Sequence, residues 1–336
     1  MNTGLRSALC AFVLAAAVLP AGATEPAPEA ACSLEGWDEA WVSQSIEGWR
    51  YTARVFGEFE PPPTMQAIFF DGACVMTSTN AMGGAGDPVW TYTAHNGQIT
   101  LPGGDQMLAT VTSFASEENG QAFFVMAAPS VWRAAGVDAG ILRLESLMTA
   151  VLIHESAHVM QTPTYGARIS RLSAANNLPD DFNDDSMQRR FESDAAFAAS
   201  IARETELFRE VAVAPTREEA LRLAREARAL MRARADRYFV GADAYYREAE
   251  DVWLTMEGSG QWLGYSWMVS FHGGDVPGRE ARPGFAQRGR WWSQTQGFAL
   301  IDALNRLTNG RWTDDVFGPG ERTALEIMDA ALAAPT

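Results

Sequence analysis

The chain has 336 residues, of which 47% are hydrophobic, a composition typical of a folded globular protein rather than a disordered one. Its 42 acidic and 26 basic residues give a formal net charge of −16, and each of those 26 is an arginine. A chain this acidic is poorly suited to bind nucleic acid or an anionic membrane, so we expect neither as a partner. The length allows one large domain or two modest ones.

The first 23 residues have the features of a secretory signal peptide. Arg6 supplies the positive start, residues 8–19 form a short apolar run, and Ala21-Gly22-Ala23 resembles a cleavage site. No later segment offers about 20 uninterrupted apolar residues, the length that a membrane-spanning helix needs. We therefore predict an exported protein that does not insert into the membrane after signal cleavage. The absence of lysine and the abundance of alanine favour a bacterial protein, hence a periplasmic or secreted location.

The cysteines indicate one disulfide. Cys10 belongs to the signal peptide, which leaves Cys32 and Cys74 in the exported chain. In an oxidising compartment an isolated pair most simply forms one bridge, here in the N-terminal region. Neither cysteine has the C-x-x-C spacing of a thiolate metal site.

Residues 24–135 are predicted to form a β-rich and turn-rich part. Residues 90–94 and 98–101 are typical of a hairpin built on the Asn96-Gly97 turn. Two further strands are expected at residues 107–114 and at Gln121–Ala128, and Pro129 ends the second of them.

Residues 136–336 are predicted to be mainly helical, because apolar residues recur at helical spacing. The first helix spans Val137–Gln161 and ends before Pro163. A later helix follows Pro215 and opens with the capping-box pattern of residues 216–219, and its alternating Glu and Arg residues are predicted to face solvent. The other helices are expected near residues 186–212, 242–270, 293–307 and 321–333, with a Gly- and Arg-rich loop at 272–290.

The most informative segment is the H-E-x-x-H pentapeptide His154-Glu155-Ser156-Ala157-His158. Residues four apart lie on one face of a helix, so both imidazoles can reach one Zn²⁺. Glu155 can then act as the general base for a water that the metal activates. Only four histidines occur in the chain, so this spacing is improbable by chance. The pentapeptide therefore predicts a zinc site.

A catalytic zinc site normally has three protein ligands and one open position. No third histidine follows closely after His158, and the two that remain, His95 and His272, are not suitably placed. A carboxylate on a later helix is therefore expected. Glu257 is the preferred candidate because it lies in a strongly apolar and aromatic helix, where an unpaired carboxylate would be costly. Glu192, in a more polar segment, is the alternative.

These motifs resemble those of the gluzincin metallopeptidases. The pentapeptide and residues 159–161, V-M-Q, are similar to the H-E-x-x-H-x-x-Q helix of exported bacterial zincin-like proteins, many of them uncharacterised. Residues 256–262, M-E-G-S-G-Q-W, are similar to the N-E-G-x-A-x-Y phrase around the gluzincin glutamate ligand. Glu257 and Gly258 are retained, and the positions of Asn, Ala and Tyr are changed. The small residues 258–260 would also let another helix pack closely.

The resemblance implies an α+β, zincin-like fold, in which an antiparallel β-rich part precedes a mainly helical part that carries the H-E-x-x-H helix. It also implies a sheet whose edge strand pairs with an extended peptide. Gln121–Ala128 is the candidate edge strand, and an ordinary core strand is the alternative. Members with this layout carry an acidic helix between the two motifs, so Glu192 and Asp194 would orient a ligand histidine.

The implied activity is zinc-dependent hydrolysis of peptide bonds in a peptide or protein substrate. Glu155 would take a proton from water and pass it to the leaving amine. A donor to the developing oxyanion is usual, and His272 and Tyr265 are the predicted candidates. Two alternatives stay open: a noncatalytic exported zincin-like binding protein, against which the retained Glu155 argues, and a zinc hydrolase of a non-peptide amide or ester.

Overall fold

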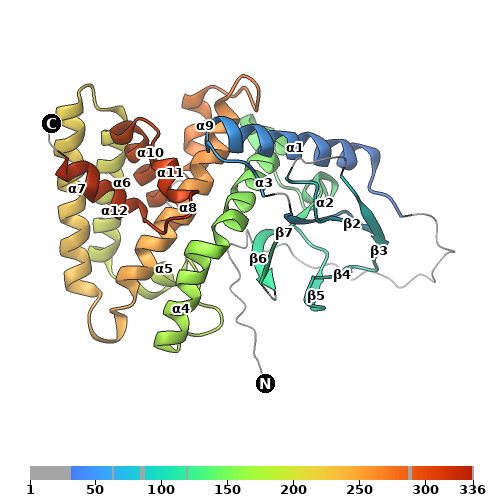
Figure 1. Cartoon of the computed structure of the whole chain (residues 1–336), viewed down its shortest axis with the longest axis horizontal. Coiled ribbons are helices and arrows are strands. Elements are labelled where there is room, and N and C mark those ends of the chain that lie inside the picture. The colour runs from blue at the N-terminus through green and yellow to red at the C-terminus, as the bar shows by residue number, and fades with distance from the viewer. Residues whose placement is uncertain (1–31, 63, 84–87, 119, 287–289, 335–336) are drawn as a thin grey trace.

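The chain folds into a sheet and a helical bundle that share one apolar core. The structure, a computed structural model, describes residues 32–62, 64–83, 88–118, 120–286 and 290–334. The predicted signal peptide, residues 1–23, lies outside the described residues. The fold is mixed α+β, with the small sheet on one side of the molecule and the bundle on the other (Figure 1). Helix α3, Leu144–Gln161, runs between them.

The N-terminal part begins with a helix that the apolar pattern did not reveal. Helix α1, Gly36–Val55, buries residues three and four apart, among them Trp41, Ile46 and Trp49. This spacing is helical, but serine and threonine on the same face interrupt the apolar pattern. The Trp41 indole donates to the Thr149 hydroxyl of α3 at 3.2 Å, which fixes α1 against that helix. The part predicted to be β-rich therefore combines a long helix with strands.

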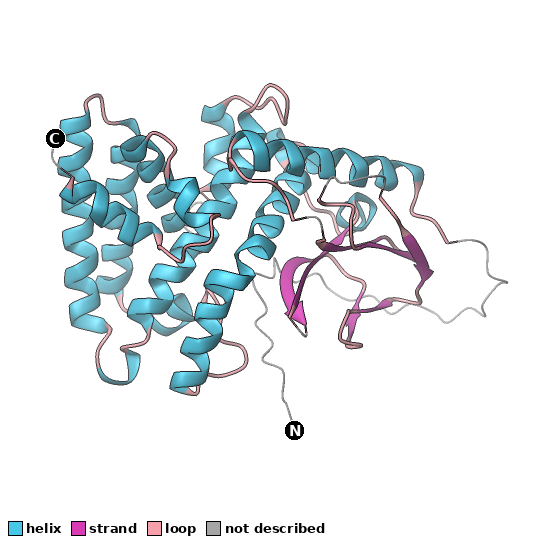
Figure 2. Cartoon of the chain, viewed as in Figure 1, coloured by secondary structure: helices cyan, strands magenta, loops and turns pink. Residues whose placement is uncertain are grey.

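Five strands form the main sheet in the order β3-β2-β1-β7-β6. The strands β1 and β7 are parallel, and the other neighbours are antiparallel (Figure 2). A separate two-stranded ribbon pairs β4 with β5. The strand bounds are β1 Gln66–Phe70, β2 Cys74–Ser78, β3 Thr91–Ala94, β4 Gln98–Thr100, β5 Gln106–Leu108, β6 Ser113–Glu118 and β7 Gln121–Ala127.

Three predicted features of the β-part are wrong. The single strand expected at residues 107–114 is divided between β5 and β6, which belong to different sheets. Residues 90–94 and 98–101 do not pair across Asn96-Gly97, because β3 pairs with β2 and β4 pairs with β5. Nor is Gln121–Ala128 an edge strand, since β7 pairs with β1 on one side and with β6 on the other. Its last five residues are all buried, as expected of a strand covered by neighbours. The alternative, a core strand, is confirmed, and β6 forms this edge of the sheet.

The predicted disulfide is confirmed. Cys32 and Cys74 are bonded, with their Cα atoms 5.8 Å apart. The bond ties the segment before α1 to the first residue of β2, so it holds the described N-terminal end of the chain against the sheet.

The helical part contains one long helix, α8, Tyr246–Val269, surrounded by shorter ones (Figure 1). Within the described residues, no helix is long and apolar enough to cross a membrane. The other helical segments are α2 Pro129–Ala134, η1 Gly140–Leu142, η2 Thr162–Gly166, α4 Ala167–Asn176, α5 Ser186–Phe191, α6 Ala195–Val213, α7 Arg217–Tyr238, η3 Gly241–Asp243, α9 Gly278–Phe285, α10 Trp292–Thr308, α11 Trp312–Val316 and α12 Ala324–Ala333.

Helix α3 ends at Gln161, before Pro163, as predicted, but it begins at Leu144 and not at Val137. The chain continues through the π-helical turn η2 into α4. The Thr162 hydroxyl donates to the His158 carbonyl at 3.0 Å, and the Thr164 hydroxyl donates to the Gln161 carbonyl at 3.2 Å. These hydroxyls supply hydrogen bonds where proline lacks an N–H, and the wider turn accommodates its ring.

Three further corrections concern the later helices. The helix expected at 186–212 is broken between α5 and α6, where Asp194 caps the second segment. The loop expected at 272–290 contains α9. On α7, Arg228 and Arg234 are buried, whereas all the charged residues of that helix were expected to face solvent.

Glycines of α8 allow the close helix crossings that position the functional site. A Cβ at Gly258 would lie 2.3 Å from the carbonyl oxygen of Gly297 in α10, and one at Gly264 would lie 2.8 Å from the Ala150 carbonyl oxygen in α3. A Cβ at Gly260 would lie 2.7 Å from Nδ1 of His154. Any larger residue would push these helices apart, so the prediction of close packing at 258–260 is confirmed.

Candidate metal centre

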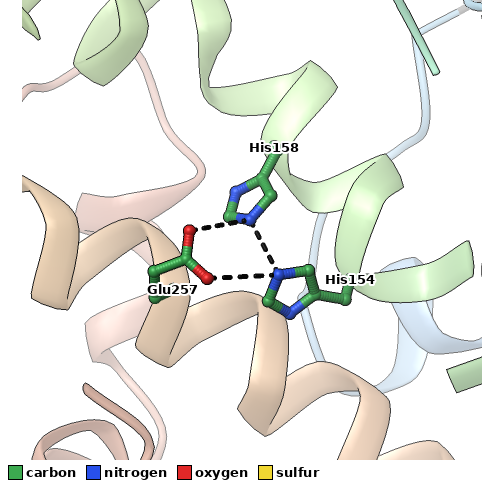
Figure 3. Close-up of side chains that lie close together, drawn as sticks. All are labelled: His154, His158 and Glu257. Carbon is green, nitrogen blue, oxygen red and sulfur yellow. Dashed lines mark hydrogen bonds and ion pairs between the residues drawn. The ribbon is translucent and has the colours of Figure 1, made fainter. Parts of the chain in front are cut away.

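Two neighbouring helices bring three ligand-type side chains together. His154 and His158 lie one turn apart on α3, and Glu257 faces them from α8 (Figure 3). The two imidazole Nε2 atoms are 2.8 Å apart. The carboxylate oxygens of Glu257 lie 3.4 Å from Nε2 of His154 and 3.3 Å from Nε2 of His158. All three side chains are buried, so Glu257, not the alternative Glu192, completes the group.

The arrangement fits a tetrahedral metal ion. Ligand atoms about 2.0–2.1 Å from such an ion lie roughly 3.3 Å from one another, close to the two histidine–glutamate separations above, whereas the two imidazole nitrogens are closer together. Two imidazole nitrogens and one carboxylate oxygen are also a donor set that zinc accepts. The His154, His158 and Glu257 group can therefore hold a metal ion.

The charges of these three residues also favour a bound cation. Burial alone would lower the pKa of His158, but the Glu257 carboxylate raises it to about 9. Burial would raise the pKa of Glu257, yet the charge of His158 and hydrogen bonds from both histidines hold it well below its usual range. Burial and the positive charge of His158 lower the pKa of His154. Binding of a metal ion here would compete with protons for the two imidazoles.

Gln161 orients one of the ligands. Its Oε1 lies 3.3 Å from Nδ1 of His158, and its Nε2 donates to the Ser259 hydroxyl at 2.7 Å. Because the Gln161 amide nitrogen is engaged as a donor, its oxygen accepts from the His158 Nδ1–H. This leaves the Nε2 lone pair of His158 directed at the site. By contrast, Nδ1 of His154 has no hydrogen-bond partner among the described residues and lies against Gly260.

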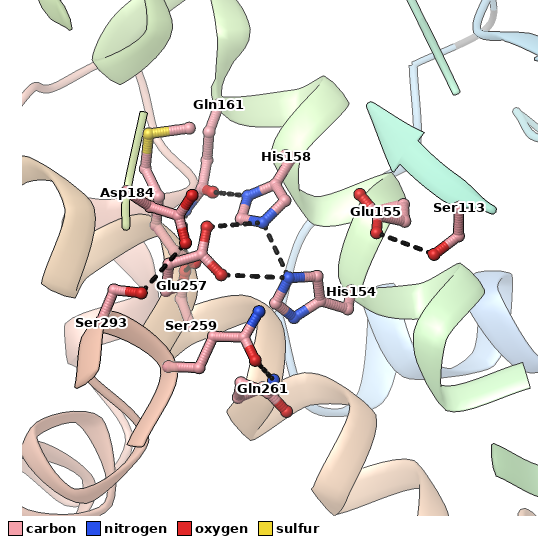
Figure 4. Close-up of polar contacts among 12 residues, drawn as sticks. Ser113, His154, Glu155, His158, Gln161, Asp184, Glu257, Ser259, Gln261 and Ser293 are labelled. Carbon is pink, nitrogen blue, oxygen red and sulfur yellow. Dashed lines mark hydrogen bonds and ion pairs between the residues drawn. The ribbon is translucent and has the colours of Figure 1, made fainter. Parts of the chain in front are cut away.

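A buried aspartate beside Glu257 was not recognised from sequence. Asp184 comes from the acidic turn before α5 and lies next to Glu257 (Figure 4). It accepts a hydrogen bond from the Ser293 hydroxyl of α10 at 3.0 Å. For the adjacent Asp185, burial and the charge of Glu257 raise the pKa to about 6. In the sequence, the sign of this contribution is the cluster of aspartates at residues 180–185. Such a cluster is typical of an exposed turn, so it does not indicate a buried site.

Glu192 and Asp194 do not have the predicted role of orienting a ligand histidine. Glu192 is exposed at the end of α5. Asp194 accepts hydrogen bonds from the backbone N–H groups of Ala196 and Phe197 at 2.9 and 3.0 Å. It therefore serves as the N-cap of α6 instead of supporting the metal group.

Glu155 points from α3 toward the edge strand β6 (Figure 4). The Ser113 hydroxyl of β6 donates to Oε1 of Glu155 at 3.3 Å, and both residues are fully buried. Burial raises the pKa of Glu155 to about 8, although the positive charge of His158 opposes this shift. A carboxyl group held near neutral pKa is suited to accept and then release a proton.

The two predicted oxyanion donors have their contacts elsewhere. Tyr265, just over two helical turns beyond Glu257, packs on Phe285 and Phe298 and lies beneath the guanidinium of Arg282. His272 is exposed after the end of α8 and contacts the ring of Tyr51 at 5.9 Å. The structure does not bring either residue to the three ligands. Tyr265 lies on the side of α8 that faces α9 and α10, and His272 follows the end of α8.

Comparisons with known proteins do not assign the chain to a family. No family model, no curated protein and no solved structure matches the chain. The resemblance to gluzincins therefore stays a prediction.

Proposed function

We propose that the protein is a zinc-dependent hydrolase that cleaves peptide bonds outside the cytoplasm. The observation that carries the proposal is the convergence of His154, His158 and Glu257 beside the buried carboxyl of Glu155. Three protein ligands and an adjacent base are the parts that metal-assisted hydrolysis requires. A binding protein that only held a metal would have no use for the fourth group.

The residues have distinct roles in this proposal. His154, His158 and Glu257 would hold Zn²⁺, which supplies a Lewis acid that acidifies water and polarises a carbonyl group. Glu155 accepts the proton of the attacking water at a carboxylate oxygen and delivers it to the leaving nitrogen. Ser113 holds Glu155 through its hydroxyl, so the base is oriented before substrate arrives.

The position of β6 favours a peptide as the substrate. This strand lies at the edge of the sheet and contacts α3 through Ser113 and Glu155. An extended peptide that adds to such an edge forms main-chain hydrogen bonds and passes beside the metal centre. An ester or a small amide would have no use for these backbone groups. β6 thus takes the role that was predicted for Gln121–Ala128.

The disulfide supports activity outside the cytoplasm. The Cys32–Cys74 bond requires an oxidising compartment to form and persist. Together with the signal-like residues 1–23, it favours the periplasm or the extracellular medium.

The proposal is tested by comparing the zinc-loaded protein with its Glu155→Gln variant on a broad peptide library. We expect the variant to retain zinc and to lose at least about a hundredfold in rate, because only the proton transfer is removed. Glu145→Gln is the matched control, since Glu145 lies on the same helix but is half exposed and paired with Arg133. Equal rates for wild type and Glu155→Gln would overturn the proposal.

A further inference from the structure

A cleft of about 650 Å³ lies between α6, α9 and the beginning of α10. None of the three metal ligands lines it, and neither does Glu155. Its volume is within the range of sites that bind a small organic molecule. The cleft is therefore a candidate binding site separate from the metal centre.

The cleft has two distinct ends, because α6 and α10 run side by side in the same direction. The rings of Phe197 and Trp292 stack with their centroids 5.7 Å apart where the two helices begin. Near the other end of both helices, the Arg306 guanidinium donates to the Ala214 carbonyl at 3.3 Å. Between these contacts, the part of α6 that lines the cleft is residues 198–209, a length of about 16 Å along the helix axis. An elongated ligand can therefore contact both ends at once.

The end of the cleft beside Trp292 is apolar. Ile201 and Ala202 line it on α6, and Ala286 lines it at the end of α9. The Ala286 carbonyl accepts a hydrogen bond from the Thr295 hydroxyl at 3.2 Å, which holds Ala286 about one turn along α10 from Trp292. An alkyl chain that covers these side chains removes apolar surface from water.

The two threonines of the lining favour an alkyl chain over a peptide at this end. The Thr205 hydroxyl donates to the Ile201 carbonyl at 2.7 Å, and the Thr295 hydroxyl donates to the Ala286 carbonyl. Each hydroxyl has a single proton, so neither can donate to the carbonyl groups of a peptide while these bonds persist. A hydrocarbon chain needs no such donor.

The opposite end of the cleft is lined by guanidinium groups. Arg209 of α6 lies about three turns beyond the stacked rings, and Asp302 lies nearly three turns beyond them on α10. Arg282 of α9 forms an ion pair with Asp302, so it lies at the level of Arg209. Arg279, one turn before Arg282 on α9, is the third arginine of the lining.

The lining is positive although the chain is strongly negative. It contains these three arginines and one glutamate, Glu206, whereas the whole chain has 26 basic and 42 acidic residues. Glu280 and Asp302, which pair with Arg279 and Arg282, do not line the cleft. An excess of positive groups in the lining of a cleft favours an anionic ligand.

Arg282 is held in place and can still donate to a ligand. Its guanidinium lies over the rings of Tyr265 and Phe298, at 5.0 and 5.8 Å from their centroids. Among the described residues, its hydrogen bonds go to Asp302 and to the Tyr265 hydroxyl, which engages two of its five N–H groups. The remaining N–H groups can donate to the oxygens of a carboxylate.

We infer that this cleft binds a single-chain amphiphile with a carboxylate head, such as a fatty acid. The carboxylate lies among Arg209, Arg279 and Arg282, and the alkyl chain lies along α6 toward Trp292. Hydrogen bonds from the guanidinium groups recognise the head, and burial of the chain against the apolar end supplies most of the affinity. The site does not include the metal centre, so the inference does not depend on the proposed hydrolysis.

Titration calorimetry of the full protein with dodecanoate, below the concentration at which it forms micelles, tests the inference. One molecule should bind per chain, at least about a hundredfold more tightly than acetate, which lacks the alkyl chain. Dodecanoate should also bind at least about tenfold more tightly than dodecyltrimethylammonium, which has the same chain and the opposite charge. Equal binding of these two amphiphiles would overturn the inference, because the arginines would then not select the ligand. Tighter binding of an acidic peptide with apolar residues would overturn it in favour of a protein partner.

Variants at the arginine end test the position of the head. The double variant Arg209→Gln with Arg279→Gln should weaken dodecanoate binding by at least about tenfold. Arg203→Gln is the matched control and should leave binding unchanged, since Arg203 is a partly exposed, glutamate-paired arginine of α6 that does not line the cleft.

Variants at the apolar end test the position of the chain. Ala202→Trp fills this end and should weaken dodecanoate binding by at least about a hundredfold. Ala199→Trp places the same side chain at an exposed position of α6 outside the lining and should leave binding unchanged. Thermal unfolding identifies any variant that fails to fold. Unchanged affinity in the folded Ala202→Trp variant or in the folded double arginine variant would contradict the assignment.

Discussion

Two buried polar clusters lie on the same helix, one built around an arginine and the other around two histidines. Glu250 and Glu257 are seven residues apart on α8, about two helical turns. Glu250 forms an ion pair with the guanidinium of Arg234 at 2.7 Å, and the same guanidinium donates to Glu204 through two hydrogen bonds of 2.9 and 2.8 Å. Glu257, by contrast, faces two imidazoles that carry a positive charge only when they bind a proton.

The two clusters also differ in the groups that surround them. The Arg234 guanidinium lies over the rings of Phe197 and Phe239, at 4.9 and 5.5 Å from their centroids. An arginine keeps its positive charge when it is buried. Around Glu257 lie two further buried carboxyl groups, those of Glu155 and Asp184. In a buried cluster with a fixed cation the carboxylates are already compensated, whereas buried carboxylates beside imidazoles are suited to take a metal ion from solution.

The largest effect is expected from removing the fixed cation. Arg234→Met leaves Glu204 and Glu250 buried without a positive partner, so the free energy of unfolding should fall by about 3–5 kcal/mol. Urea denaturation measures the change. Arg222→Met, on the exposed face of the same helix, should change it by less than about 0.5 kcal/mol. Similar decreases in the free energy of unfolding in the two variants would show that Arg234 contributes no more to stability than an exposed arginine.

Removing the third ligand should act on metal binding. Glu257→Gln should weaken zinc binding by about a thousandfold, equivalent to about 4 kcal/mol, and should remove the increase in melting temperature that zinc produces. Glu192→Gln is the control and should bind zinc as the wild type does, because Glu192 is exposed. Loss of zinc only in the Glu192 variant would reverse the ligand assignment.

Asp251, between the two glutamates on α8, provides a smaller effect that depends on pH. Burial raises its pKa to about 7, so the folded state binds a proton more tightly than the unfolded state. Its contribution to stability is therefore fully present below about pH 4 and is lost as pH rises through 7. Asp251→Asn should raise the free energy of unfolding by about 2 kcal/mol at pH 8 and by little at pH 4. A gain independent of pH would contradict this account.

The smallest effect is expected from the side chain behind the metal group. Gln161→Leu should weaken zinc binding by about tenfold, because His158 loses the acceptor that orients its ring. Gln161→Glu keeps an acceptor at the same place and should restore most of the affinity. Competition with a chromophoric zinc chelator measures both values, and equal affinities in all three proteins would assign Gln161 a packing role only.

The ligands of the metal group could be predicted from sequence because their signals are local. His154 and His158 have the one-turn spacing that places two side chains on one helix face. Glu257 is the single carboxylate in the apolar stretch 252–269 of the sequence, where a buried carboxylate needs a partner. Both predictions use only residues that are neighbours in the sequence, and the structure places all three side chains together.

The remainder depends on contacts between distant segments. Ser113 reaches Glu155, and Asp184 reaches Glu257, only through the packing of the sheet and of α10 against α3 and α8. The edge position of β6 is a property of strand order, which alternation along one strand does not encode. Arg234 was expected to face solvent because its partners lie on other helices.

The proposed function depends on zinc binding by His154, His158 and Glu257. Zinc-edge X-ray absorption of the protein loaded with one equivalent of zinc tests it most directly. The account predicts four light ligands at about 2.0–2.1 Å, with the scattering pattern of two imidazoles. A six-coordinate ion without imidazole scattering, or zinc that remains in solution, would contradict it.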